Sequence, residues 1–120
     1  MAESIKKRIL VVDDDLKSRK LLKDILEWAG YEVVVVEGGD EAIEYLTTEQ
    51  DFHLIITDIL MPYMSGIELV EKLKTYKETK NIPILGISAH ISKKGDLETD
   101  DFLAKPIDTN LLLKKVKKLI

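Results

Sequence analysis

The chain has 120 residues, of which 45% are apolar and 33% are charged, and its formal net charge at pH 7 is −4. These values predict a single globular domain over residues 1–120, and the acidic balance excludes a basic face for direct binding of nucleic acid. The chain has no cysteine and no apolar run of signal-peptide or membrane-spanning length, so disulfides, thiolate chemistry and cysteine metal sites are excluded, and we expect a cytoplasmic protein with no membrane contact.

The first half of the chain alternates short β-branched runs with segments of helical periodicity. Arg8–Val12 predicts a buried strand, and Leu16–Ala29 carries apolar residues at helical spacing. Gly30 is placed to end that helix at its C′ position. A second strand is expected at Glu32–Val36, and a second helix at Asp40–Glu49, where the acidic first turn suits the helix dipole.

The second half of the chain continues this alternation. The elements expected there are a strand at Leu54–Thr57, a helix carrying Ile67–Leu73, a strand at Ile82–Ile87, a very short strand at Phe102–Ala104 and a last helix capped by Asp108 or Thr109. Alternating strands and helices predict an α/β protein whose parallel sheet is covered by helices on both faces. The strands lack polar alternation, as expected when both sides are buried.

Polar side chains stand where four of the five predicted strands end. Asp13 and Asp14 follow the first strand, Asp58 the third, Ser88 the fourth and Lys105 the fifth. In a doubly wound, flavodoxin-like sheet with strand order 2-1-3-4-5, these four strands are neighbours, and ligands bind beyond their carboxyl ends. We therefore expect all five side chains to converge at one edge of the sheet.

The expected cluster has the groups that phosphoryl transfer needs. Crowded carboxylates repel one another unless a cation compensates, and hard oxygen ligands suit Mg²⁺. An aspartate can act as the nucleophile, and the phosphoryl oxygens can bind a metal ion, an ammonium and a hydroxyl. The pattern thus favours phosphoryl transfer to Asp58, with Lys105 and Ser88 holding the phosphoryl oxygens.

Four motifs, each at a strand end, carry a resemblance that covers essentially the whole chain. They are Ile9–Asp15, Leu54–Pro62 with Gly66, Ile84–Ala89 and Phe102–Pro106. The chain resembles the receiver domain of two-component response regulators, and specifically a stand-alone receiver of the chemotaxis-regulator type with no output domain.

The resemblance implies a phosphorylation-dependent signalling switch. Asp58 would accept a phosphoryl group from a histidine kinase or a phosphotransfer protein. Mg²⁺, or Mn²⁺ in its place, would be bound directly by Asp14 and Asp58, through a water molecule by Asp13, and by the backbone carbonyl of Leu60. The signal would pass to a downstream effector protein, from a monomer or a weak homodimer.

The resemblance also implies how the phosphate is held and reported. Ser88 and Lys105 would bind the phosphoryl group, Ser88 and Phe102 would form the conformational switch, and the Lys105–Pro106 peptide bond would be cis, an uncommon state. Receivers usually place a full helix, the fourth, before the last strand. The stretch 90–101 is short and poor in apolar residues, so we expect a frayed or one-turn helix there.

Simpler interpretations exist for single residues. The run Asp13–Asp15 before a helix can be an N-cap with acids that complement the helix dipole, and this is the only role expected for Asp15. A second class of function is a pseudo-receiver, a structural interaction module that is not phosphorylated in use. Intact Asp14, Asp58 and Lys105 argue against it.

A third class is a hydrolase with a nucleophilic aspartate, as in haloacid-dehalogenase-type phosphatases. Those proteins have an Asp-x-Asp pattern at the nucleophile, whereas Asp58 is followed by Ile59 and Leu60. The acid/base aspartate is therefore missing. We expect no turnover enzyme, only phosphoryl transfer to Asp58 and its later autodephosphorylation.

Overall fold

The structure, a computed structural model, describes residues 6–89 and 99–120. It contains a five-stranded sheet in the order β2-β1-β3-β4-β5, and every neighbouring pair is parallel. The strands are β1 at Arg8–Val12, β2 at Glu32–Val36, β3 at Leu54–Asp58, β4 at Ile84–Ser88 and β5 at Asp101–Ala104. The predicted parallel sheet and its strand order are confirmed.

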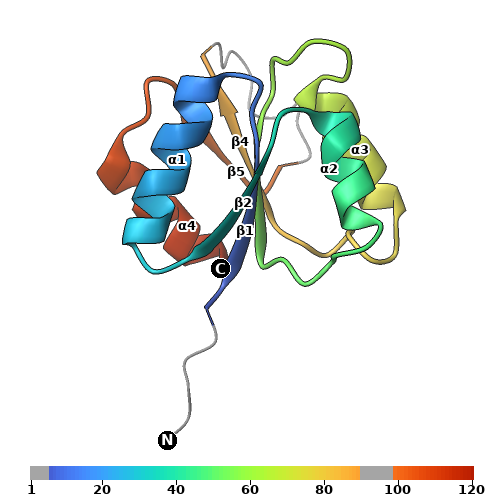
Figure 1. Cartoon of the computed structure of the whole chain (residues 1–120), viewed down its shortest axis with the longest axis horizontal. Helices are drawn as coiled ribbons and strands as arrows, with labels where there is room; N and C mark the ends of the chain where they lie inside the picture. Colours follow the sequence, from blue (N-terminus) through green and yellow to red (C-terminus); the bar gives the residue numbers. More distant parts are fainter. Residues whose placement is uncertain (1–5, 90–98) are drawn as a thin grey trace, which may run out of the picture.

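Helices cover both faces of the sheet, as Figure 1 shows, with α1 and α4 on one side and α2 and α3 on the other. Their bounds are Leu16–Trp28 for α1, Gly39–Leu46 for α2, Gly66–Thr75 for α3 and Thr109–Leu119 for α4. The short fourth helix expected after Ser88 falls on residues 90–98, outside the described residues, and stays a prediction. Within the described ranges, no helix is long and apolar enough to cross a membrane.

Each face of the sheet has its own apolar core. On β1, Leu10 and Val12 belong to the core under α2 and α3, whereas Ile9 and Val11 belong to the core under α1 and α4. All four side chains are fully buried. Successive residues of a strand point to opposite faces, so a strand that is apolar throughout is buried on both sides. Polar chemistry is therefore carried at the strand ends.

The caps of the helices follow the sequence. The side chain of Asp15 accepts a hydrogen bond from the Ser18 amide at the start of α1, and Asp108 accepts one from the Leu111 amide at the start of α4. Asp108 is thus the one of the two expected residues that caps the last helix. Gly30 has a φ of +99°, the left-handed conformation that suits a glycine just after a helix.

Several element boundaries differ from the sequence-based expectation, and two of the differences have a local cause. The helix expected at residues 40–49 ends at Leu46, because the chain after it turns, with the Thr47 hydroxyl donating to the Glu44 carbonyl. The strand expected from Ile82 begins at Ile84. Pro83 has no N–H to donate to a sheet ladder, which explains the later start.

The strand register brings the carboxyl ends of β1, β3, β4 and β5 to the same level. Val12 on β1 pairs with Thr57 on β3, and Ser88 on β4 pairs with Ala104 on β5. Asp58 is the last residue of β3. The residues that follow these positions leave the sheet along one edge.

Candidate functional site

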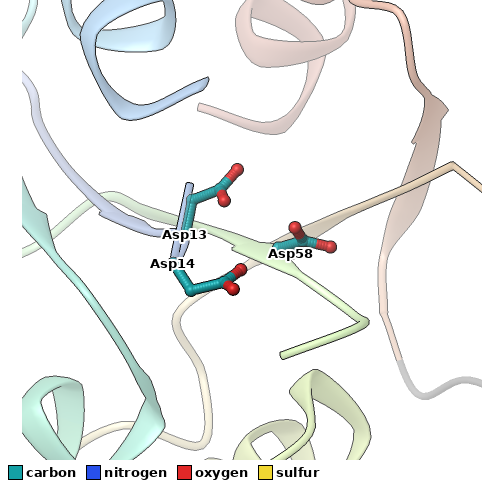
Figure 2. Close-up of side chains that lie close together, drawn as sticks. All are labelled: Asp13, Asp14 and Asp58. Carbon is teal, nitrogen blue, oxygen red and sulfur yellow. The ribbon is translucent and has the colours of Figure 1, made fainter. Parts of the chain in front are cut away.

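Three carboxylates meet at this edge of the sheet. Asp13 and Asp14 directly follow β1 and Asp58 ends β3; one carboxylate oxygen from each lies within 4.8 Å of the other two. Figure 2 shows Asp13 and Asp14 at the end of β1, with the Asp14 carboxylate directed toward Asp58. Asp13 and Asp58 are buried and Asp14 is exposed. The side chains are thus close enough to share one cation.

Lys105 lies against this acidic cluster. Its Nζ is 2.9 Å from Oδ2 of Asp58 and 3.2 Å from Oδ2 of Asp13. Burial opposes the charged form of Lys105, but the hydrogen bond to Asp58 and the charges of both carboxylates outweigh it and raise the pKa of the ammonium. Lys105 is therefore a fixed positive charge facing the nucleophile that the sequence predicts.

The carboxyl of Asp13 has a perturbed affinity for protons. Burial is the largest cause and raises its pKa, and the charge of Asp58 acts in the same direction. The hydrogen bond from the Asp15 amide and the ammonium of Lys105 act against this rise and only partly offset it. A bound divalent cation would stabilise the ionised form of Asp13, which burial and the charge of Asp58 destabilise.

The backbone after Asp58 is folded tightly around it. The amide of Leu60 donates to Oδ1 of Asp58 at 3.1 Å, and the Gly66 amide donates to the Ile59 carbonyl at 2.8 Å. A Cβ at Gly66 would lie 2.3 Å from the carbonyl oxygen of Asp58. Only glycine allows this close approach, which brings the first turn of α3 against the end of β3.

Ser88 lies on β4, the strand next to the one that ends in Asp58, and Phe102 lies on β5, one strand further along the sheet. Ser88 is buried at the end of β4, and its carbonyl accepts a hydrogen bond from the Lys105 amide at 3.0 Å. Phe102 is buried on β5, three residues before Lys105. The Lys105–Pro106 peptide bond is cis. The five polar residues predicted from the sequence therefore occupy the ends of four neighbouring strands, with Lys105 in contact with Asp13 and Asp58 and with Asp14 close to both carboxylates.

Arg19 lies at this site but was not predicted from the sequence. The guanidinium of Arg19, on α1, donates to the backbone carbonyl of Asp13 at 2.8 Å and lies 3.4 Å from a carboxylate oxygen of Glu37. Its side chain is only 11% exposed. The composition gives a clue to the role of Arg19, because lysine supplies 16 of the 18 basic residues and arginine only two. A rare arginine is a candidate for a buried, geometrically defined contact.

The donor set fits a hard divalent cation. Carboxylate oxygens with a nearby backbone carbonyl and space for water are what Mg²⁺ prefers, and no thiolate or imidazole is part of the three-residue group. A hollow of about 320 Å³ opens beside the cluster. It is lined by Asp14, by residues 37–41 and by residues 62–64. Solvent can therefore reach the acidic edge on the side of Asp14.

A parallel α/β sheet of order 2-1-3-4-5 with an acidic cluster and a lysine at its carboxyl edge defines a receiver-type signalling module. Residues 9–117 match the response regulator receiver domain family, and the chain belongs to that family. It is thereby a signalling module of two-component systems.

Relatives and solved structures agree with this assignment. The chain is 31% identical over 120 residues to the polar-differentiation response regulator DivK of Brucella ovis, covering 95% of this chain and 96% of that protein. The chemotaxis regulator CheY4 of Vibrio cholerae superposes with a TM-score of 0.90 at 29% identity, covering 97% of this chain and all of that one. The regulator TrrA of Thermotoga maritima, solved in complex with Mg²⁺ and BeF, gives a TM-score of 0.86 at 37% identity, covering 95% and 99%.

Other relatives are much longer than this chain. The phosphodiesterase regA of Dictyostelium discoideum is 34% identical over 96% of the chain, but the match spans only 15% of that protein. The match to the transcriptional regulator CpxR of Escherichia coli spans 49% of its length.

Proposed function

We propose that the protein is a phosphorylation-dependent switch that accepts a phosphoryl group on Asp58 from a histidine kinase or a phosphotransfer protein. The observation that carries the proposal is the placement of Lys105 Nζ 2.9 Å from Asp58 while two further carboxylates share the same edge. Membership of the receiver family supports it. The solved relative that holds Mg²⁺ and BeF adds support, because that regulator binds these ions.

The proposed cation site uses four groups. Asp14 and Asp58 would bind Mg²⁺ or Mn²⁺ directly, Asp13 would bind it through water, and the Leu60 carbonyl would complete the set. When bound, the cation supplies positive charge to the phosphoryl oxygens and relieves the repulsion between the carboxylates. The short distances among the carboxylate oxygens and the hard character of these ligands support this assignment.

The proposed transfer is a direct displacement at phosphorus. A carboxylate oxygen of Asp58 bonds to phosphorus, the phosphorus–nitrogen bond of the donor's phosphohistidine breaks, and the donor imidazole takes up a proton. Lys105 then donates to one phosphoryl oxygen and Ser88 to another, in place of the Lys105–Asp58 ion pair. Water later attacks the acyl phosphate, which releases inorganic phosphate and regenerates the Asp58 carboxylate.

The proposed output runs through Ser88 and Phe102. A hydrogen bond from Ser88 to the phosphate would pull the end of β4 toward the site, and Phe102 on the adjoining strand would move inward. The phosphate thereby biases an existing equilibrium between two states. The proposed partner is a downstream effector protein in the cytoplasm. The chain would bind it as a monomer or a weak homodimer, without direct contact to nucleic acid or membrane.

Intact-mass measurement after incubation with acetyl phosphate and Mg²⁺ tests the proposal. We expect a mass gain of one phosphoryl group, lost in Asp58→Asn and after addition of EDTA. Asp24→Asn, an exposed acid on α1, is the matched control and should be labelled like the native chain. A native chain that gains no mass from acetyl phosphate or a phosphohistidine donor would favour the pseudo-receiver instead.

A further inference from the structure

The turn between β2 and α2 has no place in the proposed chemistry, yet it contacts both loops that carry the proposed cation ligands. Residues 37–38 of this turn and residues 39–41 at the start of α2 line the hollow beside the acidic cluster, together with Asp14 from one loop and residues 62–64 from the other. It therefore lies where it can set the spacing between the two loops.

The first loop is fastened to this turn by polar contacts. The Asp13 amide donates to the Val36 carbonyl at 3.2 Å. Arg19 binds the Asp13 carbonyl and reaches the carboxylate of Glu37, so its guanidinium bridges the end of β1 and the start of the turn. A half-buried guanidinium that uses both of its terminal nitrogens holds these partners in a defined geometry.

The second loop is held against the start of α2 by an apolar contact of Met64. Met64 is buried, and its side chain lies against the bare Cα of Gly39, the first residue of α2. A Cβ built on Gly39 would lie 2.6 Å from the sulfur of Met64, 3.0 Å from its Cγ and 3.3 Å from its Cβ. Because Gly39 has no Cβ, a space is left beside its Cα that the Met64 side chain fills. We call this space the Met64 seat.

We infer that Gly39 is a positioning residue for the proposed cation and phosphate site, because it seats Met64 and so fixes the loop that carries Leu60. The inference rests on the proposed function. Gly39 touches no reacting group, and it acts only by letting the loop approach the turn. Side chains that orient ligands from outside a metal site commonly change metal affinity by about 10-fold or more when altered.

The chain offers a matched pair of glycines for the test. Gly38 has a φ of −164°, extended backbone that any residue adopts, and a Cβ there would meet nothing within 4 Å. Gly38→Ala and Gly39→Ala make the same chemical change one residue apart. We expect Mn²⁺ binding, followed by electron paramagnetic resonance without any phosphoryl donor, to weaken about 10-fold in Gly39→Ala and to stay near the native value in Gly38→Ala.

A compensating variant shows whether the effect passes through Met64. Met64→Ala removes the sulfur that the methyl group added by Gly39→Ala would strike, so Gly39→Ala/Met64→Ala should bind Mn²⁺ more tightly than Gly39→Ala alone. Contacting residues show such non-additive effects, whereas independent ones do not. Mn²⁺ affinity unchanged in Gly39→Ala, or a double variant at least as weak as the single one, overturns the inference.

Thermal unfolding in EDTA separates positioning from general destabilisation. A Gly39→Ala protein that only unfolds at lower temperature, with native Mn²⁺ affinity, has a structural defect and also overturns the inference. If Gly39→Ala does not fold, the comparison is made between the native chain and Met64→Ala, which must lose affinity by loosening the loop. A native chain that binds Mn²⁺ but is never phosphorylated refutes the proposed function and leaves this inference standing on binding.

Discussion

Lys105 and Asp58 form a direct ion pair in which Nζ lies 2.9 Å from Oδ2, and the same ammonium reaches Asp13 at 3.2 Å. In this arrangement Lys105 neutralises part of the charge that a divalent cation would otherwise meet. Two unit charges about 4 Å apart interact by roughly 4 kcal/mol at the effective dielectric constant of a protein surface. The lysine therefore competes with a cation for the same carboxylates.

We predict that Lys105→Met binds Mg²⁺ more tightly than the native chain, by roughly 10-fold, which corresponds to about 1.4 kcal/mol. The same variant should lose phosphorylation by acetyl phosphate, because no ammonium remains for the phosphoryl oxygens. Isothermal titration with Mg²⁺ measures the first effect and intact mass the second. Lys117→Met, an exposed lysine on α4, serves as control. Weaker Mg²⁺ binding in Lys105→Met would contradict the competition.

The raised pKa of Asp13 predicts how stability depends on pH in the absence of metal. A carboxyl whose pKa is higher in the folded than in the unfolded state binds its proton more tightly when folded. The free energy of unfolding therefore falls as the pH rises from the ordinary value of 3.8 through the raised pKa, as Asp13 loses its proton.

Asp13→Asn should remove this part of the pH dependence. Urea unfolding in EDTA, from about pH 4 upward, should show the native chain losing stability relative to Asp13→Asn over that window. Added Mg²⁺ should reverse the ranking at neutral pH, because the native chain keeps the Asp13 carboxylate beside the cation and should bind it more tightly than Asp13→Asn, which retains only Asp14 and Asp58. A native chain that gains stability relative to Asp13→Asn as the pH rises, without metal, would be the opposite of what burial predicts.

The sequence predicted the sheet and most of the site because both follow from local patterns. Apolar runs located the strands, and the parallel order then placed Asp13, Asp58 and Lys105 at one edge. Arg19 and the Met64 seat at Gly39 could not be predicted in this way. They depend on which side chains from distant segments meet, and nothing in the local spacing encodes that.

Asp101, at the start of β5, makes another contact between distant segments that local sequence patterns do not predict. In the structure, Asp101 is buried and accepts a hydrogen bond from Lys115 Nζ at 2.8 Å, which ties the edge strand to α4. The pairing joins residues on two separate elements and has no signature in either one.

This ion pair predicts a stability effect that differs between neighbouring lysines. The side chains of Lys115 and Asp101 are 23% and 11% exposed, so solvent screens the pair only in part. Lys115→Met leaves the Asp101 carboxylate buried without this partner and should lower the free energy of unfolding by about 1–2 kcal/mol, after a reduction for the remaining exposure.

Lys114→Met is the matched control, since Lys114 is exposed on the same turn of α4 and should change stability by less than about 0.5 kcal/mol. Urea unfolding at neutral pH measures both. The double variant Asp101→Asn/Lys115→Met should lose less than the sum of the single losses, because it removes the buried charge together with its ammonium partner. Equal losses from Lys114→Met and Lys115→Met would show that the pair contributes nothing.

At Tyr63 we predict a substitution that stabilises the chain, in contrast to the destabilising substitution of Lys115. It has a φ of +68°, the left-handed region that L side chains rarely adopt, and its side chain is 100% exposed. Removing the side chain therefore costs no packing, whereas removing Cβ relieves a strain of about 1–2 kcal/mol. We expect Tyr63→Gly to be more stable than Tyr63→Ala by about 1 kcal/mol, because alanine keeps the Cβ and the strain.

Asparagine provides a second comparison at the same position, because its side chain tolerates the left-handed region while keeping a Cβ. Tyr63→Asn should lie between the glycine and alanine variants in the free energy of unfolding, measured by urea at neutral pH in EDTA. Gly30→Ala, at a second positive φ of +99° among the described residues, should lose stability for the same backbone reason. If Tyr63→Ala proves as stable as Tyr63→Gly, the backbone at residue 63 is not strained in solution, and the loop beside Asp58 adopts a different conformation there.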